Sequence, residues 1–441
     1  MNAPLYGLKR AVFDYESGRN DICCDRGCDQ DGPSIFIYRN TKDPEQSCVI
    51  GWVIDDLIAA GDVDAVREFM DRVQQPTENT DGIVFKDTWK IVQVAAQEQT
   101  LHHIGINISF WLDTNNAAIH FKFDMQDYAQ ALVNRIDAKL LNGRVSTAGA
   151  IPSATSSPGS GQFAESCRSL VSAAQHLGRV CMPELVQPLN SLSTRFNTWG
   201  TDEDRRLLHT FSYIYKAVAE GKVYIEGCVG IDDEISFNLY TDSDHAGCPF
   251  TRRSTGGHVS VLEGRITNWC LSWRSNIQKF VARCSGEAEG RAMQDGLSEE
   301  LVELDDATQS LHAVSSEMAR SALGQLALLE GLVNEKVQMR LHVDATTAIA
   351  CSRRGTSKLM GYLAKTQSVN FLWIREQIQQ FGISVLKVES AFNLADVLTK
   401  CVSNTTLRTV LPMMGRAAIS TQTVPHQVLD YRIGAQCGGS P

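Results

Sequence analysis

Residues 235–247 constrain the fold of this chain more than any other stretch, because a β-favouring segment there ends in acidic side chains. The run Ile-Ser-Phe-Asn-Leu-Tyr at its start alternates β-favouring residues and predicts a strand. Asp242 and Asp244 follow, and a small-residue turn comes after them. A sheet can hold a strand-end carboxylate in place as a metal ligand, although an aspartate there is more often a solvated turn residue. The metal interpretation therefore depends on other carboxylates in comparable positions.

Three further acidic residues meet that condition. Glu289 lies in a long helical pattern, Asp344 follows the short apolar segment 339–343, and Asp396 stands at a helix start. Mg²⁺ prefers oxygen ligands, so a group of carboxylates is the kind of site that binds it. The contexts of the four acidic residues, in chain order, are strand end, helix, strand end and helix start.

Several short motifs between residues 235 and 402 share their order and spacing with one protein family. In chain order they are Tyr240-Thr241-Asp242-Ser243-Asp244-His245-Ala246-Gly247, Thr251-Arg252-Arg253-Ser254-Thr255-Gly256-Gly257, Ile266-Thr267-Asn268-Trp269, Ala282-Arg283-Cys284-Ser285-Gly286-Glu287-Ala288-Glu289 and Asn393-Leu394-Ala395-Asp396-Val397-Leu398-Thr399-Lys400. With them the chain resembles the ribonuclease H domain of copia-type LTR-retrotransposon Pol polyproteins. The resemblance implies an α/β (α+β) fold of the ribonuclease H type, in which helices flank a mixed five-stranded sheet.

The resemblance also implies a reaction, its ligands and its partners. The reaction is hydrolysis of the RNA strand of an RNA–DNA hybrid, assisted by two Mg²⁺ (or Mn²⁺) ions roughly 4 Å apart. Asp242 would bridge both ions. Glu289 and Asp344 would complete the ion on the leaving-group side, and Asp396 the ion on the nucleophile side. The implied partners are the hybrid itself and other Pol or Gag products of a retroelement.

Simpler roles for two acidic residues remain open, and the chain departs from the family at two positions. Asp396, three residues after Asn393, has a capping-like position, and Glu287 is more simply a partner for the helix dipole. Gly290 replaces an aromatic residue, which predicts weaker packing under this helix. Thr366 replaces the histidine of the family's Lys-His-Ile tract.

The nuclease-like segment is predicted to span residues 228–410. Its expected elements are strands at 235–242, 257–263 and 265–273, helices at 285–309 and 315–332, a strand at 339–343, helices at 346–353 and 359–381, a strand at 383–388 and a closing helix from 394.

Residues 1–142 resemble the reverse transcriptase of the same family. The matching runs are Tyr6-Gly7-Leu8-Lys9, Ile104-Gly105-Ile106 and Val53-Ile54-Asp55-Asp56, the last in place of the palm motif Tyr-Val-Asp-Asp. A palm needs three carboxylates around two ions, and the third would precede Met1. The prediction is a truncated palm with a vestigial site at Asp55 and Asp56 and no polymerase activity. A plain polar hairpin tip at these two residues is the alternative.

The remaining segments connect or follow these two parts. Within residues 1–142, strands are expected at 35–39 and in a hairpin at 48–61, helices at 62–73 and 127–141, and a second hairpin at 104–110 and 118–123. Gly, Ser, Thr and Pro at 143–162 predict a linker, and amphipathic spacing at 163–227 predicts a helical thumb or connection. Residues 411–441 carry no consistent pattern and are expected to be a poorly ordered tail.

Composition limits the surfaces available for binding. A formal net charge of -10 argues against a broad electropositive surface, so nucleic acid would be bound by local basic groups. The candidates, each also interpretable as solvated charge, are Arg252, Arg253, Arg353, Arg354 and Lys358. The 13 scattered cysteines fit a reducing compartment, and we see neither a secretory segment nor an apolar run long enough for a bilayer. The expected location is intracellular, either cytoplasmic or nuclear.

Two functional hypotheses follow. In the first, the chain is a metal-dependent nuclease acting on RNA–DNA hybrids, attached to an incomplete polymerase. In the second, it is a retroelement relic that folds and at most binds nucleic acid. Cleavage that depends on Asp242 separates the two.

Overall fold

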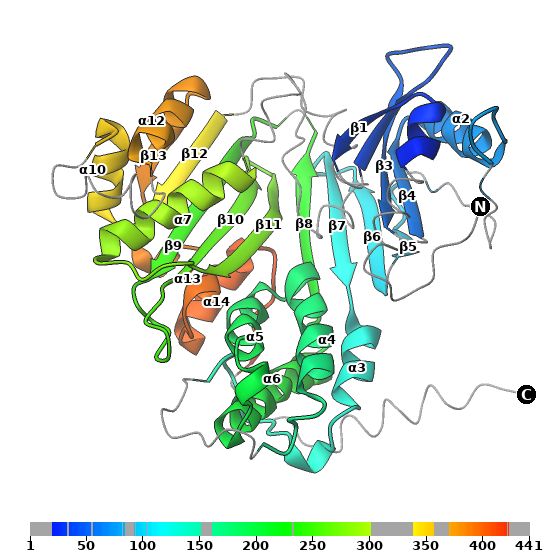
Figure 1. The fold of residues 1–441 in the computed structure, drawn as a ribbon. Helices are drawn as coiled ribbons and strands as arrows, with labels where there is room; N and C mark the ends of the chain where they lie inside the picture. Colours follow the sequence, from blue (N-terminus) through cyan, green and yellow to red (C-terminus); the bar gives the residue numbers. More distant parts are fainter. Residues whose placement is uncertain are drawn as a thin grey trace, which may run out of the picture.

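The structure is a computed structural model, and it describes residues 20–32, 35–53, 56–81, 83, 92, 94–103, 105–150, 161–231, 233–300, 338–356, 370–420 and 422. These residues form a mixed α/β molecule with one large sheet and one small sheet (Figure 1). Among them, no helix combines the length and the apolar character that crossing a bilayer requires.

The large sheet contains nine strands in the order β13-β12-β9-β10-β11-β8-β7-β6-β5. Their bounds are β5 Gln99–His103, β6 Ile106–Asp113, β7 Ala118–Asp124, β8 Tyr224–Gly230, β9 Ser236–Asp244, β10 Thr255–Glu263, β11 Asn268–Ile277, β12 Gln338–Val343 and β13 Ser384–Lys387. Strands β9, β10 and β11 pair in antiparallel fashion, whereas β12 runs parallel to β9 and β13 parallel to β12. The sheet is therefore mixed, as predicted.

The sheet is larger than the predicted five strands, because segments upstream of the nuclease-like region extend it. Asn268 of β11 pairs with Cys228 of β8, and β8 in turn carries β7, β6 and β5 as an antiparallel ladder. This pairing covers an edge of β11 that would otherwise expose unpaired backbone groups. The hairpin predicted at 104–110 and 118–123 is confirmed as β6 and β7.

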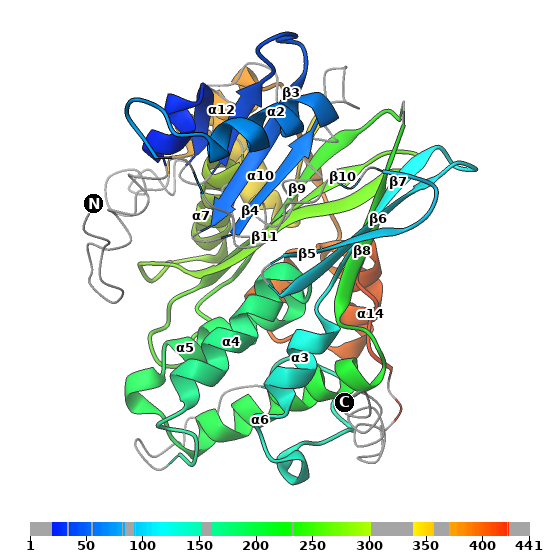
Figure 2. The same ribbon diagram turned by 90° about the vertical axis from the view of Figure 1, so that its right-hand side faces the viewer.

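Helices cover both faces of the nuclease-like part of the sheet (Figures 1 and 2). Helix α7 (Ser285–Glu300) packs on β9 and β10, and α10 (Thr346–Arg354) and α12 (Phe371–Gln380) lie beside it. The short helix α13 (Asp396–Thr399) also packs on β9 and β10. A Cβ on Gly256 would contact Ala292 of α7, whereas one on Gly257 would contact Leu398 of α13. Because neighbouring residues of a strand face opposite sides, α7 and α13 lie on opposite faces.

A group of helices lies beside the sheet, near the end of β7 and β8 (Figure 1). They are α3 (Gln126–Val133), α4 (Cys167–Val180), α5 (Val186–Ser193) and α6 (Thr201–Ala219). The helix predicted at 127–141 is shorter than expected: α3 ends at Val133, and residues 138–140 form a 3₁₀ turn in which the Asp137 side chain accepts a hydrogen bond from the Lys139 N–H.

One hydrophobic core runs through the large sheet and these helices. It includes buried residues from Ile106 in β6 to Ile419, and so joins segments from all three predicted units. The described part of residues 20–83 has a separate core, built from a four-stranded sheet and one helix. The elements of this small unit are β1 (Cys28–Gly32), β2 (Ile35–Arg39), β3 (Ser47–Val53), β4 (Asp56–Gly61) and α2 (Val63–Gln74).

The predicted hairpin at 48–61 is confirmed, with Val53 of β3 paired to Asp56 of β4. Asp55 lies outside the described residues. The predicted helix at 315–332, with the beginning of the one at 359–381, also lies outside them. In the part that the structure covers, α12 begins after Asn370, whose side chain accepts hydrogen bonds from two N–H groups of the first turn.

The expectation of a poorly ordered tail from residue 411 is wrong for its first ten residues. Helix α14 (Asn404–Met413) extends into this region, and Arg416 beyond it is 1% exposed. The Arg416 guanidinium forms an ion pair with Glu184 at 3.1 Å, and the Lys216 ammonium donates a hydrogen bond to the Ser420 carbonyl. The apolar side chains of Leu411, Met414 and Ile419 are also buried in the core, so apolar packing and these polar contacts together fix the segment.

Candidate metal centre

The site begins with two carboxylates at the carboxyl ends of neighbouring parallel strands. The parallel ladder between β9 and β12 ends at the pair Thr241–Val343, so Asp242 and Asp344 follow at the same edge. Asp242 is 2% exposed, and its cross-strand neighbour on the other side is Gly257 of β10. Asp344 is partly exposed, and the Ser390 hydroxyl donates a hydrogen bond to its Oδ2 at 2.8 Å.

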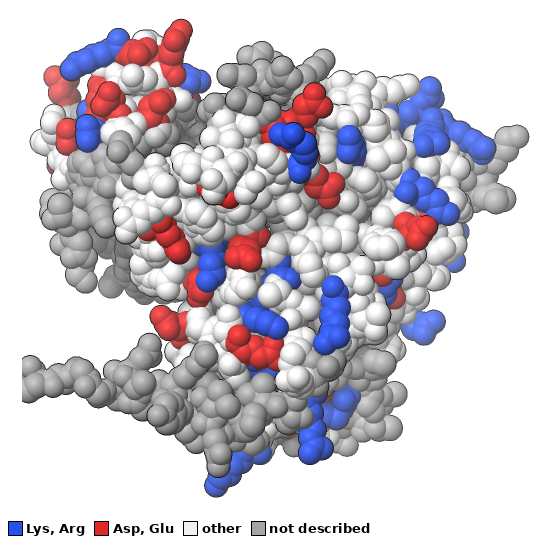
Figure 3. Space-filling view, turned by 180° about the vertical axis from the view of Figure 1, so that it is seen from behind, with Lys and Arg blue, Asp and Glu red and all other residues white. Residues whose placement is uncertain are grey.

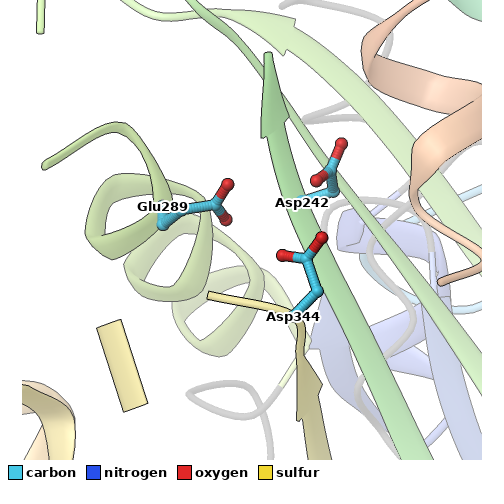
Figure 4. Close-up of side chains that lie close together, drawn as sticks. All are labelled: Asp242, Glu289 and Asp344. Atoms are coloured by element: carbon cyan, nitrogen blue, oxygen red, sulfur yellow. The ribbon is translucent and has the colours of Figure 1, made fainter. Parts of the chain in front are cut away.

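Helix α7 supplies the third carboxylate. Glu289 stands in its second turn and points toward the two aspartates, as Figure 4 shows. One carboxylate oxygen from each of Asp242, Glu289 and Asp344 lies within 4.8 Å of the other two. We call these three residues the carboxylate trio. The structure thus brings together three of the four predicted ligands from three separate elements.

The trio is electrostatically costly as it stands. Burial, with the negative charges of Asp242 and Asp344 beside it, raises the pKa of Glu289 to about 9. Burial also raises the pKa of Asp242, although Lys400 and Thr399 oppose that shift. Glu289 is only 5% exposed, and its Oε2 accepts no hydrogen bond from any residue that the structure describes. A buried acceptor without a partner, facing two other carboxylates, fits a divalent cation.

The fourth predicted ligand, Asp396, lies on the other side of Asp242. It is the first residue of α13, 6% exposed, and does not belong to the carboxylate trio. The Lys400 ammonium lies 3.0 Å from Asp396 Oδ1 and 3.6 Å from Asp242 Oδ2, and so joins the two. Burial first, and then the charge of Asp242, raise the pKa of Asp396 to about 7. Its carboxylate is therefore engaged in an ion pair rather than in capping the helix.

Three contacts fix α13 against the site. The Thr399 hydroxyl donates a hydrogen bond to Asp242 Oδ2, and the Asn393 amide donates one to the Thr241 carbonyl at 3.1 Å. Gly257 leaves room for the helix, because a Cβ there would lie 2.8 Å from Leu398 Cβ and 3.0 Å from Thr399 Cγ2. Sequence reasoning did not single out Thr399 or Lys400, although the four-residue spacing of Asp396 and Lys400 was a usable signal.

Two other residues of α7 have structural roles. The Glu287 carboxylate accepts a hydrogen bond from the Arg283 N–H at 2.9 Å, just before the helix, which agrees with a role at the helix start. Gly290 was expected to weaken the packing of this helix, and that expectation is wrong. The ring of Phe371 from α12 fills the space, since a Cβ on Gly290 would come within 2.5 Å of it.

The basic residues predicted to contact nucleic acid lie in two places. Arg252 and Arg253 are exposed in the loop between β9 and β10. Arg353 and Arg354 are exposed at the end of α10, where the Arg353 guanidinium donates a hydrogen bond to the Val385 carbonyl at 2.8 Å. Lys358 lies outside the described residues. On the face shown in Figure 3, Lys and Arg side chains gather toward the edge where α12 and β13 lie, and elsewhere they are interspersed with Asp and Glu.

Comparisons with known proteins place the chain near transposon proteins. No family model matches it. The retrovirus-related Pol polyprotein from transposon TNT 1-94 of Nicotiana tabacum is 28% identical over 177 residues, which are 40% of this chain and 11% of that polyprotein. The one from transposon RE1 of Arabidopsis thaliana is 25% identical over 253 residues, 56% of this chain and 15% of that polyprotein.

A third relative is an uncharacterised mitochondrial protein of Arabidopsis thaliana, 30% identical over 126 residues, which are 29% of this chain and 48% of that protein. The chain thus spans less than half the length of each of these curated relatives. The motifs at residues 235–402 and the similarity to two plant transposon polyproteins agree. Over part of their length, this chain is a relative of the copia-type, retrovirus-related Pol polyproteins of retrotransposons.

Proposed function

We propose that this chain is a retrotransposon-derived ribonuclease H, which hydrolyses the RNA strand of an RNA–DNA hybrid with divalent metal ions. The observation that carries the proposal is the carboxylate trio, contributed by β9, α7 and the end of β12. The buried Oε2 of Glu289, which accepts no hydrogen bond from the described residues, supports a role for this carboxylate as a metal ligand.

The order of elements supports a ribonuclease H-like fold. Three antiparallel strands, β9, β10 and β11, are followed by α7, then β12, α10 and α12, then β13 and α13. That is the order expected from the motifs: three strands, then helices alternating with two further strands. The similarity to Pol polyproteins supports the same proposal.

The chemistry of the site follows from its ligands. Divalent ions bound by Asp242, Glu289 and Asp344 would lower the pKa of a bound water and stabilise charge on the leaving oxygen. The residues of the chain position these groups: the sheet fixes Asp242 and Asp344, Thr399 orients the Asp242 carboxylate, and α7 directs Glu289 inward. The exposed arginines that follow β9 and end α10 would pair with phosphates, whose charge the acidic site would otherwise repel.

The test is cleavage of a hybrid labelled on its RNA strand, with Mg²⁺ or Mn²⁺. The parent chain is expected to cut the RNA strand and Asp242→Asn to lose that activity. Asp127→Asn is the matched control, because Asp127 is exposed on α3, away from the trio. A folded parent that cuts nothing in either metal contradicts the proposal and leaves the alternative, a relic that at most binds nucleic acid. Polymerase activity remains predicted to be absent.

A further inference from the structure

Lys400 occupies an unusual place for a basic residue in a metal-binding site. Its ammonium lies between two buried carboxylates, 3.0 Å from Asp396 Oδ1 and 3.6 Å from Asp242 Oδ2. Those carboxylates are 6% and 2% exposed, whereas the Lys400 side chain is 42% exposed. The Lys400 side chain thus extends from solvent toward the buried carboxylates, and rotation of its aliphatic chain can return the ammonium to solvent.

The carboxylates of the site divide into two groups around Asp242. On one side, carboxylate oxygens of Asp242, Glu289 and Asp344 lie within 4.8 Å of one another, and no Lys or Arg that the structure describes forms an ion pair with Glu289 or Asp344. On the other side, Asp396 approaches Asp242 only through the ammonium of Lys400. On one side Asp242 therefore faces two carboxylates that have no ion-pair partner among the described residues, and on the other side it faces the ammonium of Lys400.

We infer that the ammonium of Lys400 competes with a divalent ion for the space between Asp242 and Asp396. This inference rests on the proposed function in one respect, because it treats the four carboxylates as metal ligands. In the metal-free protein Lys400 balances two charges whose desolvation would otherwise be uncompensated. A divalent ion can enter between Asp242 and Asp396 only when the ammonium moves outward, so the trio binds an ion first.

The ammonium cannot share this space with a metal ion. Mg²⁺ binds carboxylate oxygens at about 2.1 Å, so an ion bridging Asp242 and Asp396 would lie where the ammonium now lies. If both were present, the ammonium and the metal ion would be in close contact, and two cations so close together repel each other strongly beside buried carboxylates. The same arrangement gives a nucleic-acid phosphate a role, since it could pair with Lys400 once the ammonium has moved outward.

The test measures Mn²⁺ binding to the full chain without nucleic acid, by isothermal titration and electron paramagnetic resonance. Lys400→Gln is expected to bind one additional Mn²⁺, or to bind Mn²⁺ on the order of tenfold more tightly, because the competing charge is gone. Lys400→Arg keeps the charge and is expected to bind like the parent. Lys139→Gln, an exposed residue of the turn at 138–140, is the control for a lost surface charge. An unchanged isotherm for Lys400→Gln overturns the inference, as does an Arg variant that behaves like the Gln variant.

A second variant keeps the test decisive if Lys400→Gln does not fold. Lys400→Met also removes the charge while keeping an unbranched side chain, and it should bind Mn²⁺ as expected for Lys400→Gln; binding like the parent overturns the inference. Failure of the proposed function gives a different pattern. If Mn²⁺ binding responds as expected but the hybrid is not cut, the nuclease proposal fails and the role of Lys400 stands. If neither the parent nor Lys400→Gln binds Mn²⁺, both fail together.

Discussion

Adding one methyl group at Gly257 tests whether close packing of α13 holds the site together. A Cβ there would lie 2.8 Å from Leu398 Cβ and 3.0 Å from Thr399 Cγ2, both closer than ordinary van der Waals contact. Gly257→Ala must therefore push α13 away from the sheet. Overpacking of this kind costs about 1–3 kcal/mol of unfolding free energy. The same displacement carries Thr399 away from Asp242, and so we expect cleavage of the hybrid to fall as well.

The neighbouring glycine supplies a matched control. A Cβ on Gly256 would lie 3.5 Å from Gln278 Nε2 and 3.6 Å from Ala292 Cβ, which are ordinary contacts on the opposite face. Neither glycine has a positive φ angle, so alanine fits the backbone at both positions. Gly256→Ala is expected to be neutral or to stabilise by up to about 1 kcal/mol, because it restricts the unfolded chain.

Urea denaturation of both variants, followed by circular dichroism, gives the two free energies of unfolding. Gly257→Ala should be about 1–4 kcal/mol less stable than Gly256→Ala. Equal stabilities would refute the reasoning, because the close contact between residue 257 and α13 would then have no measurable effect on stability. Full activity in a destabilised Gly257→Ala would refute only the link to Asp242.

Three further predictions concern charge and packing. The pKa of Glu289 is raised from about 4.5 to about 9 in the folded protein, so the metal-free chain should lose stability as the pH rises through that range. Urea titrations should show a flatter pH profile for Glu289→Gln, and an identical profile would count against a buried Glu289. Arg416→Met leaves the buried Glu184 without its ion-pair partner and should cost about 3–5 kcal/mol, with Arg416→Met/Glu184→Leu recovering part of it; a loss below about 1 kcal/mol would contradict this. Phe371→Ala opens a cavity against α7 and should cost about 3–5 kcal/mol in thermal or urea unfolding, because the ring is buried beside Gly290; a loss below about 1 kcal/mol would count against this packing.

Local pattern was sufficient for the strands, whereas the choice of acidic positions as metal ligands rested on the family resemblance. Alternating β-favouring residues predicted β9, and a short apolar segment predicted β12. The two aspartates that follow their parallel ladder come together because the sheet brings both strand ends to one edge. The short-range periodicity of the sequence likewise predicted the order of the elements in the nuclease-like part. These features depend on neighbours in sequence, which a reader of the chain can see.

Contacts between distant segments could not be predicted in the same way. The residues around Gly290 do not predict that the ring of Phe371 fills the place of the absent aromatic residue. Nor do the residues around Arg416 predict its ion pair with Glu184. The pairing of β8 with β11 is a choice between strand edges, which depends on the packing of the whole molecule. The ion pair of Lys400 with Asp396 could have been predicted, because an acidic and a basic residue four positions apart lie on the same face of a helix.

The antiparallel ladder between β7 and β8 joins the part of the chain before residues 151–160 to the part after them. Seven residue pairs, from Ala118–Gly230 to Asp124–Tyr224, join strands that precede and follow that segment. Cutting the chain there would leave two pieces that share a sheet and a core, each with a bare strand edge when alone. The pieces should therefore reassociate as complementary fragments when expressed together, and aggregate when expressed apart.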